Sequence, residues 1–150
     1  MCSEEKQENI QLPWQPHHRD LREVSPVALA FVGDGVYEVL VRQRLVTRTR
    51  LAPGRLHGLA VKFVSAAGQS RALEAILPLL TEEEAAVVQR GKNSSKASVA
   101  KHATPQQYRA STAFESLLGW LQLQGKQERI LELFEVVWET FAPEFLGDKN

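Results

Sequence analysis

The sequence predicts an all-α domain, and three observations support this prediction. Strand signals are almost absent, because apolar and polar residues rarely alternate over a strand-length run. Apolar residues recur instead at helical spacing along most of the chain. Helix start signals, such as Ser before Pro or Thr three residues before Glu or Gln, stand ahead of the apolar stretches.

Length and composition indicate one soluble domain. The 150 residues are 43% hydrophobic and 24% charged, with a formal net charge of zero, as in ordinary globular proteins that bury a sizeable core. The single cysteine, Cys2, excludes an internal disulfide and a cysteine-based zinc site. No signal peptide or membrane span is recognisable, so we expect a cytoplasmic protein that does not bind membranes. Residues 1–20 and 146–150 are expected to be tails around a domain at 21–145.

Three helices are expected in the first half of the domain. The first begins at Ser25-Pro26, runs to about Leu45 and is apolar nearly all round, which predicts a central, buried position. The second is one long helix from about Arg55 to Leu77, ended by Pro78. The third is a short helix from a capping box at Thr81 to about Arg90.

The second half is expected to hold a loop and two helices. Gly91–Ala103 is polar, basic and rich in small residues, so it is predicted to be a functional loop. A helix capped by Thr104 follows and continues to about Leu121, with a break near Ser111, before Gly125 ends it. The last helix spans about Gln127 to Phe141.

The zero net charge hides two basic segments. No Asp or Glu occurs from Arg42 to Arg71 or from Gln89 to Phe114, although both stretches carry several Arg and Lys residues. A basic face on a neutral protein suits a polyanion such as nucleic acid. The alternative interpretation is that these charges lie on solvated helix faces and in loops.

Two carboxylates stand in apolar helical stretches, Asp34 in "FVGDGVYEVL" and Glu115 in "TAFESLLGWL". A buried carboxylate is costly unless it is paired or bound to metal. No Lys or Arg lies three or four residues from Asp34, and its i+4 neighbour Glu38 carries the same charge. The local sequence therefore offers Asp34 no cationic partner.

Glycines accompany both acids. Gly33 and Gly35 flank Asp34, and Gly119 follows Glu115 by one helical turn. Each glycine weakens a helix by about 1 kcal/mol relative to alanine, which favours close approach of another backbone at these positions. If the helices cross there, the two carboxylates converge and can hold Mg²⁺, which suits phosphodiester hydrolysis. The alternative is structural pairing, with Asp34 satisfied in the core and Glu115 paired with an arginine such as Arg109.

Several motifs together resemble a known family. "LAFVGDGVYE" resembles the signature helix of the ribonuclease III catalytic domain, and "STAFESLLGWLQLQG" resembles its second acidic helix. "KFVSAAGQ" and "EEEAAVVQRGKN" lie between them in the order found in Mini-ribonuclease III, the branch that has the catalytic domain alone. The resemblance extends from about Ser25 to Trp138.

The resemblance implies a homodimeric helical bundle that cuts double-stranded RNA with Mg²⁺ and leaves 5′-phosphate and 3′-hydroxyl ends. It implies maturation of the precursor of 23S ribosomal RNA, with an accessory ribosomal protein as a further candidate partner. Asp34 would hold the metal and its nucleophilic water, and Glu115 would complete the metal shell. The larger enzymes of the family have further acids where this chain has Val27, Ala30 and Thr112, so fewer protein ligands are expected.

Duplex RNA is read mainly through its shape, phosphates and 2′-hydroxyls. The candidate RNA-binding residues are Lys62, Arg90, Lys92, Asn93, Lys96, Lys101, Tyr108 and Arg109. The roles of His57 and Gln69 stay open, since Gln69 could face the site or serve the dimer. Two alternatives to an endonuclease remain: a non-catalytic RNA-binding factor for ribosome assembly with the same fold, and a helical dimerisation module.

Overall fold

The computed structural model describes residues 20–94 and 103–147, and every regular element within these ranges is helical. The elements are η2 (Leu21–Glu23), α1 (Pro26–Arg48), α2 (Pro53–Val64), α3 (Ala66–Ile76), η3 (Leu77–Leu79), α4 (Glu82–Ser94), α5 (Pro105–Leu123) and α6 (Gln127–Leu146). The all-α prediction is confirmed. None of these helices combines the length and apolar character that crossing a bilayer requires.

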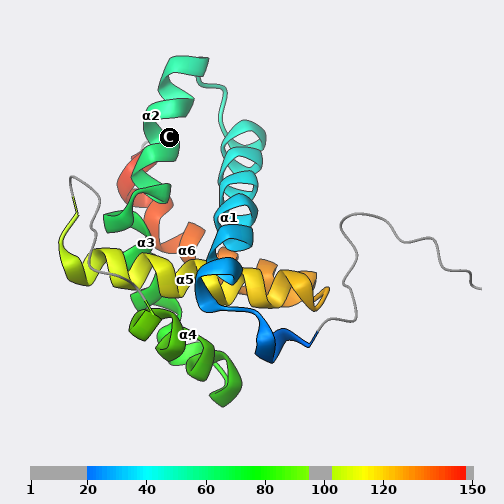
Figure 1. Ribbon diagram of the computed structural model, residues 1–150. Helices are drawn as coiled ribbons and strands as arrows, with labels where there is room; N and C mark the ends of the chain where they lie inside the picture. The colour runs from blue at the N-terminus through cyan, green and yellow to red at the C-terminus, as the bar shows by residue number, and fades with distance from the viewer. Residues whose placement is uncertain (1–19, 95–102, 148–150) are drawn as a thin grey trace, which may run out of the picture.

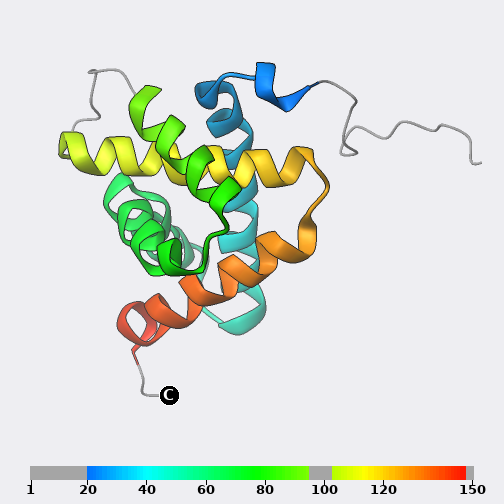
Figure 2. The ribbon, with the colours of Figure 1, turned by 90° about the horizontal axis from the view of Figure 1, so that it is seen from below.

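Helices α1 and α5 cross at the centre of the molecule and make its most extensive helix contact (Figure 1). Helices α3 and α4 also pack on α5. Figure 2 shows α6 returning from the end of α5 toward α2 and α3, with which it is in contact. The core between these helices includes the fully buried Leu29, Tyr37, Phe63, Phe114 and Phe141.

The helix starts follow the capping signals in the sequence. Ser25 Oγ accepts a hydrogen bond from the Ala28 N–H at the start of α1. Thr104 and Gln107 form a reciprocal capping box at α5, and Thr81 exchanges the same pair of bonds with Glu84 at α4. These three predicted starts are confirmed. They could be predicted because their capping bonds join residues that are close in sequence and need no distant partner.

The prediction of a single long helix from Arg55 to Leu77 is wrong. Ser65 has extended backbone angles (φ −65°, ψ 163°) and divides the segment into α2 and α3. Its Oγ accepts a hydrogen bond from the Gly68 N–H at 3.1 Å, which caps α3. A Cβ at Gly68 would overlap the carbonyls of Lys62 and Phe63, so glycine is needed for the close turn between the two helices.

Two other predictions fail around α4 and α5. The loop predicted for Gly91–Ala103 is wrong at its start, because α4 continues to Ser94 with Gly91 buried against Ala113, and residues 95–102 lie outside the described ones. The predicted break near Ser111 is absent. The Ser111 and Thr112 hydroxyls instead donate to the Tyr108 carbonyl within an unbroken helix.

Helix α6 also continues beyond its predicted end at Phe141, as far as Leu146. Arg71 holds its last turns through two hydrogen bonds to the Glu144 carboxylate, at 3.1 and 2.8 Å. Phe145 packs edge-on against Phe63, with 5.2 Å between the ring centroids. These tertiary contacts extend the helix further than its local pattern indicates.

Candidate active site

The crossing of α1 and α5 is made by two glycines. A Cβ built at Gly33 would overlap the backbone carbonyl of Glu115, and a Cβ built at Gly119 would overlap that of Leu29. The two backbones therefore touch at this point, as the glycine spacing predicts. By contrast, a Cβ at Gly35 would meet nothing within 4 Å, so the surface next to Asp34 is open to an approaching molecule.

The crossing brings Asp34 and Glu115 together. Asp34 is exposed, whereas Glu115 is half-buried between α1, α3 and α5. Burial raises the pKa of the Glu115 carboxyl to about 8, and the negative charge of the neighbouring Asp34 adds to the rise. The two groups thus form an acidic pair that resists holding two negative charges at once.

Gln69 provides the other polar contact of Glu115. Its Nε2 donates to Glu115 Oε2 and to the Val64 carbonyl, both at 3.0 Å. Gln69 is only 2% exposed, and its Oε1 has no hydrogen-bond partner among the described residues. The sequence alone does not decide whether Gln69 faces the site or the dimer. Its place in "KFVSAAGQ", within the family resemblance, was the available signal.

The break at Ser65 explains how Gln69 reaches Glu115. Val64 lies at the end of α2, where backbone carbonyls lack partners within the helix. The break starts α3 in a new direction, and α3 packs against α5. One amide group can then satisfy the Val64 carbonyl and reach the carboxylate of Glu115.

No arginine or lysine neutralises this acidic pair within the described ranges. The ion pairs found there join other residues, such as Arg44 with Glu135 and Arg129 with Glu84. The hypothesis that Glu115 pairs with Arg109 is therefore not supported. The same part of the chain holds no group of three or more His, Cys, Asp or Glu that could bind a metal ion, so a cation here would have few protein ligands.

Three positions hold further acids in the larger enzymes of the family but Val27, Ala30 and Thr112 in this chain. Val27 is 54% exposed on α1, while Ala30 is buried. Thr112 lies one turn before Glu115, but its hydroxyl is engaged with the Tyr108 carbonyl. None of the three supplies a carboxylate, so the acidic pair consists of Asp34 and Glu115.

Part of the candidate RNA-binding set lies at the end of α4, which packs on α5. Arg90, Lys92 and Asn93 occupy the last turns of α4, where Gly91 packs against α5 beside Ser116, the residue after Glu115. Arg90 and Asn93 are exposed, and Lys92 is half-buried. Lys96 and Lys101 lie outside the described residues.

The other candidates are more dispersed. Tyr108 lies seven residues before Glu115 on the same face of α5, about 10 Å away along the helix. Arg109 is exposed on a different face of α5. Lys62 is exposed on α2, and its Nζ lies 5.6 Å from the centroid of the Phe145 ring, beside the end of α6. RNA binding by these residues stays a prediction.

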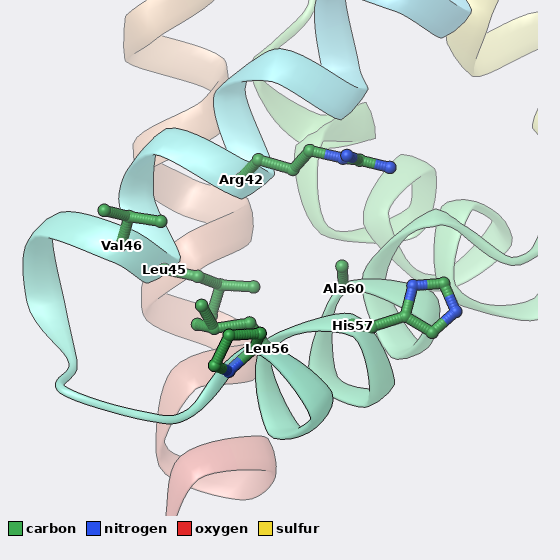
Figure 3. A pocket seen from close by; sticks show the side chains of 7 residues that line it. Arg42, Leu45, Val46, Leu56, His57 and Ala60 are labelled. Carbon is green, nitrogen blue, oxygen red and sulfur yellow. The ribbon is translucent and has the colours of Figure 1, made fainter.

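A cavity of about 230 Å³ lies away from the acidic pair, between the second half of α1 and the start of α2 (Figure 3). It is lined by Arg42, Leu45, Val46, Pro53, Leu56, His57 and Ala60. His57 and Arg42 provide the polar groups of its lining, so the structure associates His57 with this apolar cavity and not with the two carboxylates.

Comparison with known proteins gives consistent matches. Residues 27–126 match the family described as Ribonuclease III domain. A Mini-ribonuclease 3 of Brevibacillus brevis is 44% identical over 124 residues, which are 83% of this chain and 90% of the relative. One of Symbiobacterium thermophilum is 42% identical over 73% of this chain and 85% of its own length. An X-ray crystal structure of a Fusobacterium nucleatum protein superposes with a TM-score of 0.74 and 27% identity, covering 81% of this chain and 98% of that one.

Proposed function

The chain belongs to the ribonuclease III family, in its Mini-ribonuclease III branch, and is an endoribonuclease; from this premise we propose that Asp34 and Glu115 form its catalytic centre. One observation carries the assignment. The glycine crossing of α1 and α5 holds two carboxylates side by side, and no Lys or Arg among the described residues pairs with either. A structural ion pair would have a cation at this position.

Members of this family generally depend on a divalent metal, and the residues here fit Mg²⁺. Asp34 and Glu115 offer the hard oxygen ligands that Mg²⁺ prefers, and the ion commonly keeps several waters beside one or two carboxylates. The unpartnered Oε1 of Gln69 leaves a buried acceptor next to the pair. When bound, the ion would supply a more acidic water and neutralise charge on the scissile phosphate.

The protein's own residues would bind and orient the substrate. The family acts on double-stranded RNA, and the open surface at Gly35 gives a phosphate access to Asp34. Arg90 and Lys92, at the end of α4, would contact backbone phosphates that flank the cut. Their contribution is electrostatic, so RNA affinity should fall steeply with increasing salt.

We further propose that the active form is a homodimer that joins through α1. Val27, Phe31, Val39 and Val46 fall on one side of this helix, and Phe31 is 85% exposed. Such a row of exposed apolar side chains marks an interaction surface. A two-fold axis through it would present two equivalent sites to the two antiparallel strands of a duplex.

The proposed substrate is the base-paired stem of the 23S ribosomal RNA precursor, in the cytoplasm, with a ribosomal protein as a candidate accessory factor. This proposal rests on the resemblance to Mini-ribonuclease III. It is tested by incubating the purified protein with a precursor transcript, with and without Mg²⁺, and mapping both new ends. Cleavage that requires Mg²⁺, lies within the stem and leaves 5′-phosphates is the expected result.

Two variants on α1 test the catalytic assignment. Asp34→Asn should abolish cleavage, whereas Glu38→Gln removes a carboxylate one turn away, which pairs at 3.7 Å with Arg42, and should leave cleavage intact. Normal cleavage by Asp34→Asn would remove Asp34 from the mechanism. Tight RNA binding by the wild type without cleavage under any condition would favour the assembly-factor alternative.

A further inference from the structure

Gln69 connects the break between α2 and α3 to the acidic pair. Its two amide protons are both used, one by the Val64 carbonyl and one by Glu115 Oε2. The side chain is buried, and it spans two segments that are 46 residues apart in sequence, α3 and α5. The position of the Glu115 carboxylate is thereby tied to the backbone at the end of α2.

The orientation of this amide is determined by its neighbours. Exchanging its nitrogen and oxygen would place Oε1 against two other oxygens, the Val64 carbonyl and the Glu115 carboxylate. Because the Val64 carbonyl can only accept, Nε2 must face it, and the same nitrogen then also faces Glu115 Oε2. Oε1 is then the only polar atom of the Gln69 side chain without a partner among the described residues. It belongs to the same amide group that contacts the Glu115 carboxylate.

Stability alone does not account for a glutamine at this position. A buried acceptor without a partner costs about 1–3 kcal/mol, and Oε1 has none among the described residues. The two bonds of Nε2 account for an amide donor at this position, but they do not require its oxygen to be buried without a partner. The penalty has a function if something that binds at the acidic pair donates a hydrogen bond to Oε1.

We propose that Gln69 is a positioning residue of the catalytic centre. Its Nε2 holds Glu115 Oε2 and so orients the carboxylate toward the cation shared with Asp34, while its Oε1 accepts a hydrogen bond from a water that the cation retains. This inference rests on the metal site proposed above. It assigns Gln69 no bond to the RNA and no proton transfer.

The test compares Mg²⁺ affinity among variants of the full chain. Affinity is read without RNA from the rise in unfolding temperature with Mg²⁺ concentration, and independently from the Mg²⁺ concentration that gives half-maximal RNA cleavage. Partners behind a metal ligand typically contribute 10- to 100-fold in metal affinity. Gln69→Leu should therefore shift both midpoints to Mg²⁺ concentrations higher by about tenfold or more, and saturating Mg²⁺ should restore most of the cleavage.

Gln124→Leu is the matched control. The Nε2 of Gln124 also donates to a backbone carbonyl, that of Trp120 at 3.0 Å, but at the far end of α5. This control should leave both midpoints at wild-type values. If Gln69→Leu does not fold, Gln69→Met keeps a flexible side chain of similar length without the amide and should show the same shift.

The outcomes distinguish a failure of the proposed role of Gln69 from a failure of the proposed metal site. Unchanged Mg²⁺ midpoints in folded Gln69→Leu or Gln69→Met, with Asp34→Asn losing its Mg²⁺ response, would overturn the role of Gln69 and leave the metal site standing. A Mg²⁺ response that persists in Asp34→Asn would overturn the metal site itself, and this inference with it.

Discussion

Replacing Glu115 with glutamine is expected to stabilise the metal-free protein at neutral pH, although it removes a proposed catalytic group. Burial is the main reason that the pKa of Glu115 rises from 4.5 to about 8, and the charge of Asp34 adds to it. A neutral amide avoids both effects. It can still accept the hydrogen bond from Gln69 through its oxygen, and its NH₂ group can donate toward Asp34.

The size of the effect follows from linkage between protonation and folding. The folded-state pKa lies above the unfolded value, so below pH 4.5 the carboxyl is protonated in both states and costs nothing. As the pH rises from 4.5 toward 8, the unfolded state ionises first and the folded state loses stability. Each pH unit in this window costs about 1.4 kcal/mol, so the penalty reaches about 3 kcal/mol at pH 7.

The assay is urea unfolding in EDTA at pH 5 and pH 7.5, at one fixed protein concentration because the protein is proposed to dimerise. The Glu115→Gln variant should exceed the wild type by about 4 kcal/mol at the higher pH and by less than about 1 kcal/mol at the lower. Added Mg²⁺ should stabilise the wild type much more than the variant. Equal stabilities at pH 7.5 without metal would refute the buried acidic pair.

Four other substitutions test further parts of the structure. Gly33→Ala should lower the free energy of unfolding by about 2 kcal/mol or more, because its methyl group meets the α5 backbone. Gly35→Ala, in open space, should raise it by up to about 1 kcal/mol. Similar melting temperatures for the two variants would contradict the glycine crossing. Phe31→Glu should convert the proposed dimer to a monomer in light scattering, and an intact dimer would move the interface away from α1. Arg129→Ala leaves the buried Glu84 carboxylate without its cation and should cost about 3 kcal/mol in urea unfolding at neutral pH; a loss below about 1 kcal/mol would show that water replaces the guanidinium.

Most helix starts could be predicted from sequence, whereas the start of α3 and several helix ends could not. Ser25 and Thr104 cap through bonds to residues three positions away, which are visible in the sequence. The division at Ser65 depends on the packing of Gly68 against the preceding turn, and the extension of α6 depends on Arg71, over 70 residues away. The contact of Arg71 is non-local, and such contacts override local helix patterns. The turn at Gly68 is close in sequence, but the continuous apolar pattern conceals it.

The candidate site, like the helices, could be predicted from the sequence only in part. Asp34 and Glu115 stood out as carboxylates in apolar helices, and the glycines indicated where the helices could cross. Gln69 could not be assigned, because its contact with Glu115 requires the break at Ser65, which the apolar pattern conceals. A polar residue in an apolar stretch becomes informative only when the direction of its helix is known.

The glycine crossing has a consequence for protein engineering. The separation of the two carboxylates is set by main-chain contact at Gly33 and Gly119, not by the side chains that fill the rest of the core. Repacking remote positions, such as the buried Leu133 and Val137 on α6, should therefore alter heat tolerance without changing the spacing within the proposed catalytic centre. Thermostable forms can be sought there, provided that both glycines are kept.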